Sequence, residues 1–236
     1  MSHEVQVHSA QTAILRELLF APEAGFAQLQ KPTGLTSNHF NFHVARLVEL
    51  GLVEQVRAGR YRLTVRGKEY ANRLDTDNNT VERQPKAVVL LLIERERAGR
   101  REFVFQQRLK HPYFGYWGRP TGKIRWGESI VESAARELME ETGLTADYKI
   151  IGMYHERVAR KGTDEYLEDK LFFYVHCTNV RGELTAEFEG GHNAWMTREE
   201  LERQELRFAN FAEGYRIMSG EAVFLEGRRE IADEAF

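Results

Sequence analysis

Three glutamates in one short segment are spaced so that they could hold a metal ion. Glu137, Glu140 and Glu141 lie three and four residues apart, so on a helix their carboxylates are neighbours on one face. Ionised carboxylates so placed repel one another, and a divalent cation removes that repulsion. Magnesium prefers carboxylate oxygens, and waters and substrate phosphates complete its shell. The spacing therefore indicates an open site for Mg²⁺ (or Mn²⁺) in phosphate chemistry, with a solvated acidic surface as the alternative.

The residues around these glutamates predict the helix that positions them. Periodicity and end signals predict a helix over Ser129–Thr142 that ends at Gly143. Its apolar face consists of Ile130, Val131, Ala134 and Leu138. The three glutamates lie beside that face.

The string from Gly122 to Leu144 resembles the Nudix box. That pattern is a glycine, five residues, a glutamate, seven residues, arginine-glutamate-aliphatic, one residue, two glutamates, one residue and glycine-aliphatic. Every specified position matches: Gly122, Glu128, Arg136, Glu137, Leu138, Glu140, Glu141, Gly143 and Leu144. The resemblance to Nudix hydrolases covers about residues 84–236. It implies a mixed sheet between helices and Mg²⁺-dependent hydrolysis of a nucleoside diphosphate linked to another group.

The resemblance also implies metal ligands and catalytic groups. Glu137 and Glu141 would bind the metal, and Glu140 would be a further ligand or orient the attacking water. The backbone carbonyl of Thr121 would be another ligand. In a late loop, Glu189 is favoured over Glu187 as a ligand or general base, and a plain surface loop is the alternative.

Other positions would support the loop or contact substrate. The resemblance implies that Glu128 and Arg136 pair and fix the loop against the helix, with Gly122 and Gly143 as structural glycines. Arg119 and Lys123 could contact phosphates, although solvated cations are the alternative. Trp117 could stack on a base, and packing in the core or a loop is equally compatible with its sequence position.

The chain divides into two segments with different periodicities. Residues 76–85 are polar and predict a linker between a domain over residues 1–75 and another over 86–236. In the second domain we expect strands at 87–94, 102–108, 148–156 and 169–177, a helix over 198–204 and another helix near the C-terminus. The fold class is α+β with two domains, the second an α/β/α sandwich with a mixed sheet.

The first domain resembles a winged helix-turn-helix. Helices are predicted at 10–20, at 26–30 and from Thr36 or Ser37 to about Leu50. Two strands follow at 52–56 and 61–65, and a last helix covers 66–74. The segments His43–Val53 and Gly59–Gly67 carry the resemblance to the recognition helix and wing of bacterial and archaeal regulators.

Double-stranded DNA is therefore a candidate partner. The third helix is expected to bury Phe40, Val44, Leu47 and Val48 and to present Asn38, His39 and Arg46 outward, while Arg60 and Arg62 lie in the wing. Residues 1–80 hold nine basic and eight acidic residues, and this nearly balanced charge favours binding of a polyanion only weakly. Outward-facing Phe42 could instead dock on the second domain or on a second subunit, so a homodimer is another partner that the sequence allows.

Composition limits the cellular compartments in which we expect the protein. The chain of 236 residues has a formal net charge of −3 and a single cysteine, Cys177, which excludes a disulfide framework. Its first residues lack the features of a signal peptide, and the longest apolar run, Ala87–Ile93, is too short to span a bilayer. We expect a cytoplasmic protein without a membrane segment.

Two functions are compatible with this organisation. The first is a Nudix hydrolase whose winged helix regulates it or binds DNA or a partner. The second is a transcriptional regulator that senses a nucleotide through the Nudix domain and binds DNA through the winged helix. The intact box favours hydrolysis.

Overall fold

The computed structural model describes residues 7–75, 77, 80–209 and 211–236, with the side chain of Thr80 left out. The chain forms two compact units, an N-terminal unit, Met1–Arg83, and a C-terminal unit, Gln84–Phe236. Of the expected linker 76–85, residues 76, 78 and 79 lie outside the described residues. The short strand β5 (Thr80–Val81) pairs with β4 (Leu74–Asp75), so part of this segment is structured. No helix in the described ranges is long and apolar enough to cross a membrane.

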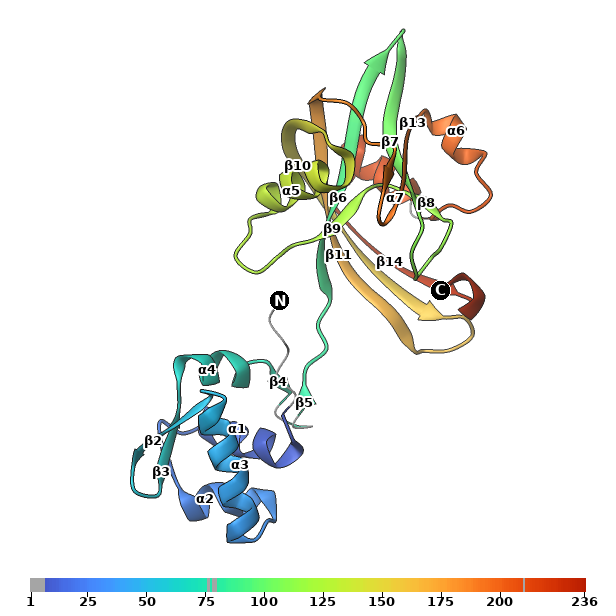
Figure 1. The fold of residues 1–236 in the computed structure, drawn as a ribbon. Helices are drawn as coiled ribbons and strands as arrows, with labels where there is room; N and C mark the ends of the chain where they lie inside the picture. The colour runs from blue at the N-terminus through green and yellow to red at the C-terminus, as the bar shows by residue number, and fades with distance from the viewer. Residues whose placement is uncertain (1–6, 76, 78–79, 210) are drawn as a thin grey trace. The chain divides into compact units, whose positions relative to one another are not determined.

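Helices and a small sheet make up the N-terminal unit (Figure 1). Its elements are α1 (Ser9–Leu19), β1 (Ala24–Gly25), α2 (Phe26–Gln30), the 3₁₀ turn η1 (Lys31–Thr33), α3 (Ser37–Glu49), β2 (Val53–Arg57), β3 (Arg60–Leu63) and α4 (Val65–Ala71). The strands pair in the order β1-β3-β2. The apolar positions of α1 and α3 meet in one core around Ile14, Leu15, Phe40 and Leu47.

One expected core position in this unit is wrong. Phe40, Val44 and Leu47 are buried as expected, but Val48 is 41% exposed. Val48 follows Leu47 directly, so it is turned about 100° around the helix axis from it. At this turn per residue, Phe40, Val44 and Leu47 lie within about 60° of one another, whereas Val48 lies about 40° beyond Val44, at the edge of the buried face.

The C-terminal unit is built on a mixed sheet. The strands are β6 (Lys86–Arg97), β7 (Arg100–Arg108), β8 (Trp117–Gly118), β9 (Thr121–Lys123), β10 (Thr145–Arg160), β11 (Tyr166–Arg181), β12 (Glu187–Phe188), β13 (Gly191–Met196) and β14 (Phe224–Ile231). Their order is β12-β13-β7-β6-β11-β10-β14, with β8 paired to β7 and β9 to β6. The pairs β6–β11 and β10–β14 are parallel and the remaining pairs antiparallel.

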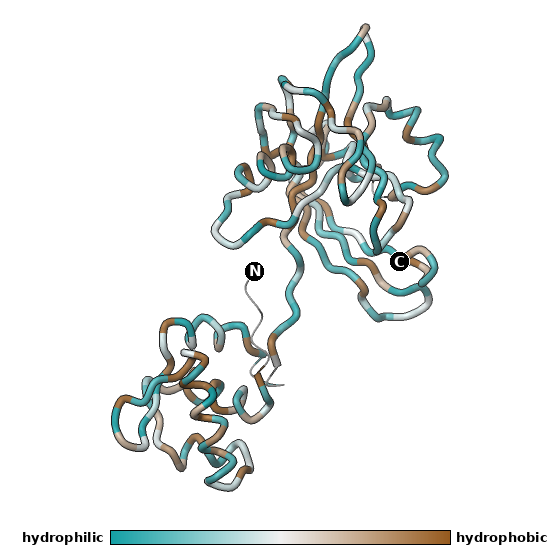
Figure 2. Tube along the Cα trace, viewed as in Figure 1, coloured by the Kyte–Doolittle hydropathy of each residue, from teal (hydrophilic) through white to brown (hydrophobic). Residues whose placement is uncertain are grey.

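Helices cover both faces of the central strands. Successive residues of β6 point to opposite faces. Val89 and Leu91 pack in the cluster that contains Ala134 and Leu138 of α5 (Ile130–Thr142). Leu90 packs on the other face with Ile217 and Met218 of α7 (Phe211–Met218). Figure 2 shows the hydrophobic stretches of these central strands. The expected sandwich with a mixed sheet is confirmed.

Four elements near the C-terminal end of the chain complete this unit. Helix α6 (Arg198–Glu202) follows β13 and begins at the cap Thr197, as predicted. The helix expected near the C-terminus is α7. The sequence reasoning missed the edge strand β14 and the 3₁₀ turn η2 (Asp233–Ala235) that ends the chain.

Candidate active site

Helix α5 is held firmly at both ends. The Ser129 side chain accepts a hydrogen bond from the backbone of Glu132, whose carboxylate in turn accepts from the Ser129 backbone. This reciprocal cap satisfies amide groups that would otherwise have no partner at the start of a helix. Gly143 ends the helix with φ +72°, a conformation in which glycine is favoured. The predicted helix and its ends are thus present.

Gly122 lets the loop strand β9 approach α5 closely. A Cβ at this position would overlap the Glu137 side chain. The adjacent Thr121 pairs with Leu90 of β6, which fixes β9 on the central sheet. Glu137 therefore occupies the space that a Cβ at position 122 would need.

Arg136 contacts three carboxylates, and the one from Glu128 ties the loop to the helix. Its Nε lies 2.6 Å from Glu128 Oε1, and its Nη1 lies 2.5 Å from Glu137 Oε1 and 3.3 Å from Glu140 Oε2. Glu128 also accepts a hydrogen bond from the Ser133 hydroxyl at 2.7 Å. The bonds from Arg136, together with that from Ser133, lower the pKa of Glu128 to about 2. The expected Glu128–Arg136 pair is present and stays ionised at neutral pH.

Glu141 has a different environment from its neighbours. Its carboxylate accepts a hydrogen bond from the Gln106 side chain at 3.0 Å, and the Asn193 amide donates to its backbone carbonyl at 2.8 Å. Burial, and to a lesser degree the nearby charge of Glu137, raises the pKa of Glu141. Glu140 is exposed and lies 3.2 Å from Arg125. The surroundings of Glu141 therefore disfavour its charged form.

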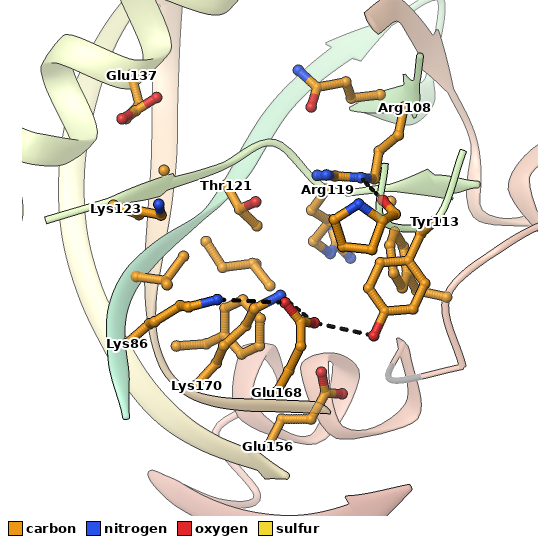
Figure 3. Close-up of a pocket in the computed structure, with 18 of the residues that line it drawn as sticks. Lys86, Arg108, Tyr113, Arg119, Thr121, Lys123, Glu137, Glu156, Glu168 and Lys170 are labelled. Atoms are coloured by element: carbon orange, nitrogen blue, oxygen red, sulfur yellow. Dashed lines mark hydrogen bonds and ion pairs between the residues drawn. The ribbon is translucent and has the colours of Figure 1, made fainter. Parts of the chain in front are cut away.

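Glu137 and Glu141 line one cavity of about 590 Å³ in the C-terminal unit. Thr121, Gly122, Gln106, Lys123 and Arg125 line the same cavity. Figure 3 shows Glu137 and Lys123 at one end and Glu156, Glu168 and Lys170 at the other. Basic residues outnumber acidic ones among the lining residues: Lys86, Arg108, Lys110, Arg119, Lys123, Arg125, Lys170 and Arg229 against Glu137, Glu141, Glu156 and Glu168.

The expected metal ligands do not form a ready cluster. Within the described parts of the chain, no three histidine, cysteine, aspartate or glutamate side chains stand together as a metal site. Arg136 holds Glu137 and Glu140, while Gln106 holds Glu141. The donor set nonetheless fits a hard cation, because oxygen ligands are what Mg²⁺ takes and the charge of Glu141 is costly without a counter-ion.

The three residues expected to contact substrate differ in their position relative to the cavity. Lys123 lines the cavity and is exposed. Arg119 also lines it, but its guanidinium lies 5.2 Å from the ring centroids of both Phe103 and Phe105, and its burial lowers its pKa to about 10. Trp117 is only 8% exposed and packs with Phe103, Phe105 and Leu201. It is not among the cavity-lining residues, so the structure favours the packing alternative for Trp117 over base stacking.

The late loop lies at the turn between β12 and β13. Glu187 Oε1 is 2.6 Å from His192 Nδ1, and Glu189 is exposed. Next to it, the Gly190 carbonyl accepts a hydrogen bond from the backbone of Leu109 at 3.1 Å. This bond places the turn beside Lys110, which lines the cavity, although neither glutamate lines it in the described residues.

Several cavity residues were missed or left unassigned by sequence reasoning. Tyr113, Glu156, Glu168 and Lys170 belong to none of the motifs in the sequence. A period-two signal is present in Glu168, Lys170 and Phe172 of β11, which share one strand face. Reading such alternation as a polar cavity wall requires the strand order, which a single sequence does not reveal.

The residues expected to read DNA lie on the surface of the N-terminal unit. Asn38, His39 and Arg46 are exposed on α3. Ion pairs join Arg46 to Glu49 at 2.6 Å, Arg60 to Glu23 at 2.8 Å and Arg62 to Glu54 at 2.5 Å. The three arginines are thus partly neutralised by acidic neighbours.

Comparison with known proteins identifies the family. The NUDIX domain family model matches residues 83–215, more than half of the chain. The Bacillus subtilis protein described as uncharacterized Nudix hydrolase YvcI is 30% identical over 88 residues, covering 37% of this chain and 54% of the relative. The chain therefore matches about half the length of that curated relative.

A solved structure agrees with this chain at the level of fold. The Nudix domain of Shewanella oneidensis NrtR, complexed with ADP-ribose, aligns with a TM-score of 0.51 at 15% identity, covering 65% of this chain and 96% of that one. A MutT protein from Bacillus halodurans aligns with a TM-score of 0.48 at 22% identity, covering 64% and 93%. Nudix hydrolases act on pyrophosphate bonds of nucleoside diphosphate derivatives, generally with divalent cations such as Mg²⁺. From the match over residues 83–215, the chain belongs to the Nudix family.

Proposed function

We propose that the C-terminal unit hydrolyses the phosphoanhydride bond of a nucleoside diphosphate linked to another group, using Mg²⁺ or Mn²⁺. One observation carries this proposal. Glu137 and Glu141 line the same cavity as the cations Arg108, Lys110 and Lys123. Carboxylates can hold the metal there, while the cations receive the phosphates.

Glu137, Glu141 and the Thr121 carbonyl would hold the ion, with Glu140 as a further ligand or the group that orients the attacking water. When bound, the ion polarises the phosphate oxygens and lowers the pKa of a bound water. The protein's part is to fix the carboxylates. The close contact of Gly122 with Glu137 and the bond from Gln106 to Glu141 do this.

Glu189 is the proposed proton acceptor. It is exposed on a turn that the Leu109–Gly190 hydrogen bond holds beside Lys110. Glu187 is a weaker candidate because His192 engages its carboxylate at 2.6 Å. Glu189→Gln should therefore lower turnover more than Glu187→Gln, and equal effects would remove Glu189 from this role.

Cations along the cavity would bind the substrate phosphates. Lys123 lines it beside Glu137, and Arg108 and Lys110 come from β7 and the segment that follows. Positioning and charge neutralisation carry most of the catalysis in phosphoryl transfer. Arg119 also lines the cavity, and we propose it as a further phosphate contact.

A substrate panel tests the proposal. Purified protein is incubated with ADP-ribose, NADH, UDP-glucose and a dinucleoside polyphosphate, with Mg²⁺ or with a chelator, and the products are identified. ADP-ribose is included because the NrtR domain binds it. We expect metal-dependent cleavage within the diphosphate of at least one compound. Absence of metal-dependent cleavage across the panel would overturn the proposal.

DNA binding by the N-terminal unit is the second candidate function, either beside hydrolysis or as the output of a nucleotide-sensing regulator. The observation that favours it is the exposed polar face of α3, with Asn38, His39 and Arg46, together with the basic residues Arg60 and Arg62 of β3. A gel shift with DNA from upstream of the protein's own gene, with and without nucleotides, tests it. We expect salt-sensitive binding, and its absence would remove this candidate.

A further inference from the structure

The cavity continues beyond the glutamates of α5 to a second polar end. The register pairs Lys86 of β6 with Lys170 of β11, and Lys170 with Glu156 of β10. These three residues form a row across neighbouring strands on the wall that Figure 3 shows opposite Arg108. We call this region the inner end of the cavity.

Buried hydrogen bonds hold the inner end in place. Glu168 is 5% exposed and accepts from the Tyr113 hydroxyl at 3.0 Å and from Lys170 Nζ at 2.6 Å. Glu156 is 2% exposed and lies 2.9 Å from Arg229. Charged groups are almost never fully buried unless they are paired, and these pairs fix the cationic heads in space.

Tyr113 is itself held in an unusual conformation. Its φ is +65°, which is uncommon for a residue other than glycine. Its ring packs against Phe208 at 5.0 Å and against Phe236 at 5.5 Å between centroids. Such conformations persist where the surroundings enforce them and cluster at binding sites. The Tyr113–Glu168 contact is thus a built feature of the cavity wall.

Charge does not balance at the inner end. Four cations face two carboxylates there: Lys86, Arg108, Lys170 and Arg229 against Glu156 and Glu168. Glu168 is engaged by Lys170, with Lys86 farther away at 3.9 Å. Arg108 uses its Nε on the Pro112 carbonyl at 2.9 Å. Burial lowers the pKa values of both Arg108 and Lys170. An anion placed between Arg108 and the two lysines would offset this cost.

We propose that the inner end binds a second anionic group of the substrate, a phosphate monoester remote from the diphosphate. A phosphate monoester carries a charge near −2 and three acceptor oxygens, which matches the surplus of two cations better than a single carboxylate does. This inference rests on the proposed function. It narrows the substrate class to nucleoside diphosphate derivatives that carry a further phosphate.

Binding of inorganic phosphate in the presence of a chelator tests the inner end without hydrolysis. Calorimetric titrations compare the wild type with Lys86→Gln, Arg108→Gln, Lys123→Gln and Lys149→Gln. Lys86 has a half-exposed side chain, so its loss should not unfold the protein. Lys149 is an exposed residue of β10 and serves as the matched control. Thermal melting verifies that each variant is folded.

We expect Lys86→Gln and Arg108→Gln each to weaken phosphate binding about tenfold, the scale of a lost charge-assisted hydrogen bond. Lys123→Gln should lose less affinity than either inner-end variant, and Lys149→Gln should bind as the wild type does. Loss in Lys123→Gln alone would place phosphate at the other end, and equal binding by all variants would show no inner site; either result overturns the inference. In a second experiment, acetate is tested as a competitor. If acetate competes as well as phosphate does, the inner end binds a carboxylate, and the inference is overturned.

A comparison of substrates distinguishes this inference from the proposed function. NADPH and NADH differ by one phosphate monoester, and we expect kcat/KM about tenfold higher for NADPH, an advantage that Lys86→Gln abolishes. Phosphate binding at the inner end without hydrolysis of any substrate would contradict only the proposed function. Hydrolysis with neither phosphate binding nor preference for NADPH would contradict only this inference.

Discussion

Helices α3 and α5 are both thirteen residues long, yet their charged side chains are held differently. In α5, Arg136 contacts three carboxylates, and Glu137 lies against the backbone at Gly122. In α3, the exposed pair Arg46–Glu49 is an isolated contact at the surface. Holding several like charges close together is costly, and function can explain such an arrangement, whereas an exposed pair contributes little. The comparison favours α5 over α3 as the helix that carries the proposed chemistry.

Removing the charge of Glu141 should have the largest effect on catalysis. Glu141→Gln keeps the hydrogen bond from Gln106 but removes the negative charge, so turnover should fall about 100-fold or more. Steady-state rates at saturating Mg²⁺ measure this, with the exposed Glu205→Gln as the matched control. Turnover within twofold of the wild type would remove Glu141 from the site.

The same variant should be more stable than the wild type when metal is absent. Burial raises the pKa of Glu141, so its ionised form costs stability, and that cost grows as pH rises through the raised pKa. Melting at pH 7 with a chelator should show a higher midpoint for Glu141→Gln. A lower midpoint would mean that the carboxylate stabilises the fold instead.

A methyl group at Gly122 should disrupt the packing of loop and helix. Because it would overlap Glu137, Gly122→Ala should cost about 1–3 kcal/mol and lower turnover. Gly25 in the N-terminal unit has φ −84° and open space around its Cβ position. Gly25→Ala should therefore cost less than about 1 kcal/mol. Chemical denaturation compares the two, and equal costs would contradict the close approach at Gly122.

The Glu128–Arg136 pair should contribute to stability in a defined pH window. The folded pKa of Glu128 is about 2, below its unfolded value of about 4.3. Its contribution is full above the unfolded pKa and is lost as pH falls from there toward 2. Glu128→Gln should be less stable at neutral pH, with a flatter decline in that window, and its turnover should drop about tenfold. Glu49→Gln in α3 is the control, and identical pH profiles would refute the assignment.

Substitutions on α3 should have the smallest effect on hydrolysis. Arg46→Ala removes one exposed partner of Glu49, so turnover should stay within about twofold, as expected for surface changes. If the N-terminal unit binds DNA as proposed, the same variant should weaken the gel shift. A large loss of turnover without loss of DNA binding would reverse the roles given to the two helices.

Local signals allowed much of the fold to be predicted. Helix α5 and its ends follow from Ser129, the apolar period and Gly143, and α2 matches its predicted span. Strand β14 was missed because its residues Phe224–Ile231 alternate around charged side chains at a sheet edge, and its partner β10 is distant in sequence.

Within the candidate site, the box residues were predictable and the inner end was not. Glu128 and Arg136 pair as the resemblance to the Nudix box implies, and both belong to one loop and the helix that follows it. Tyr113 and Glu168 are 55 residues apart and meet only through the strand order. For Trp117, the sequence left base stacking and packing open, and the structure shows that it packs with Phe103 and Leu201.

Metal binding tests most directly whether α5 is a divalent-cation centre. Mn²⁺ is titrated into metal-free wild type and Glu141→Gln, and the free ion is followed by electron paramagnetic resonance. We predict saturable binding by the wild type and affinity about tenfold weaker or more in the variant. Equal affinity in the two proteins, or no binding by the wild type with substrate analogue present, would contradict the account.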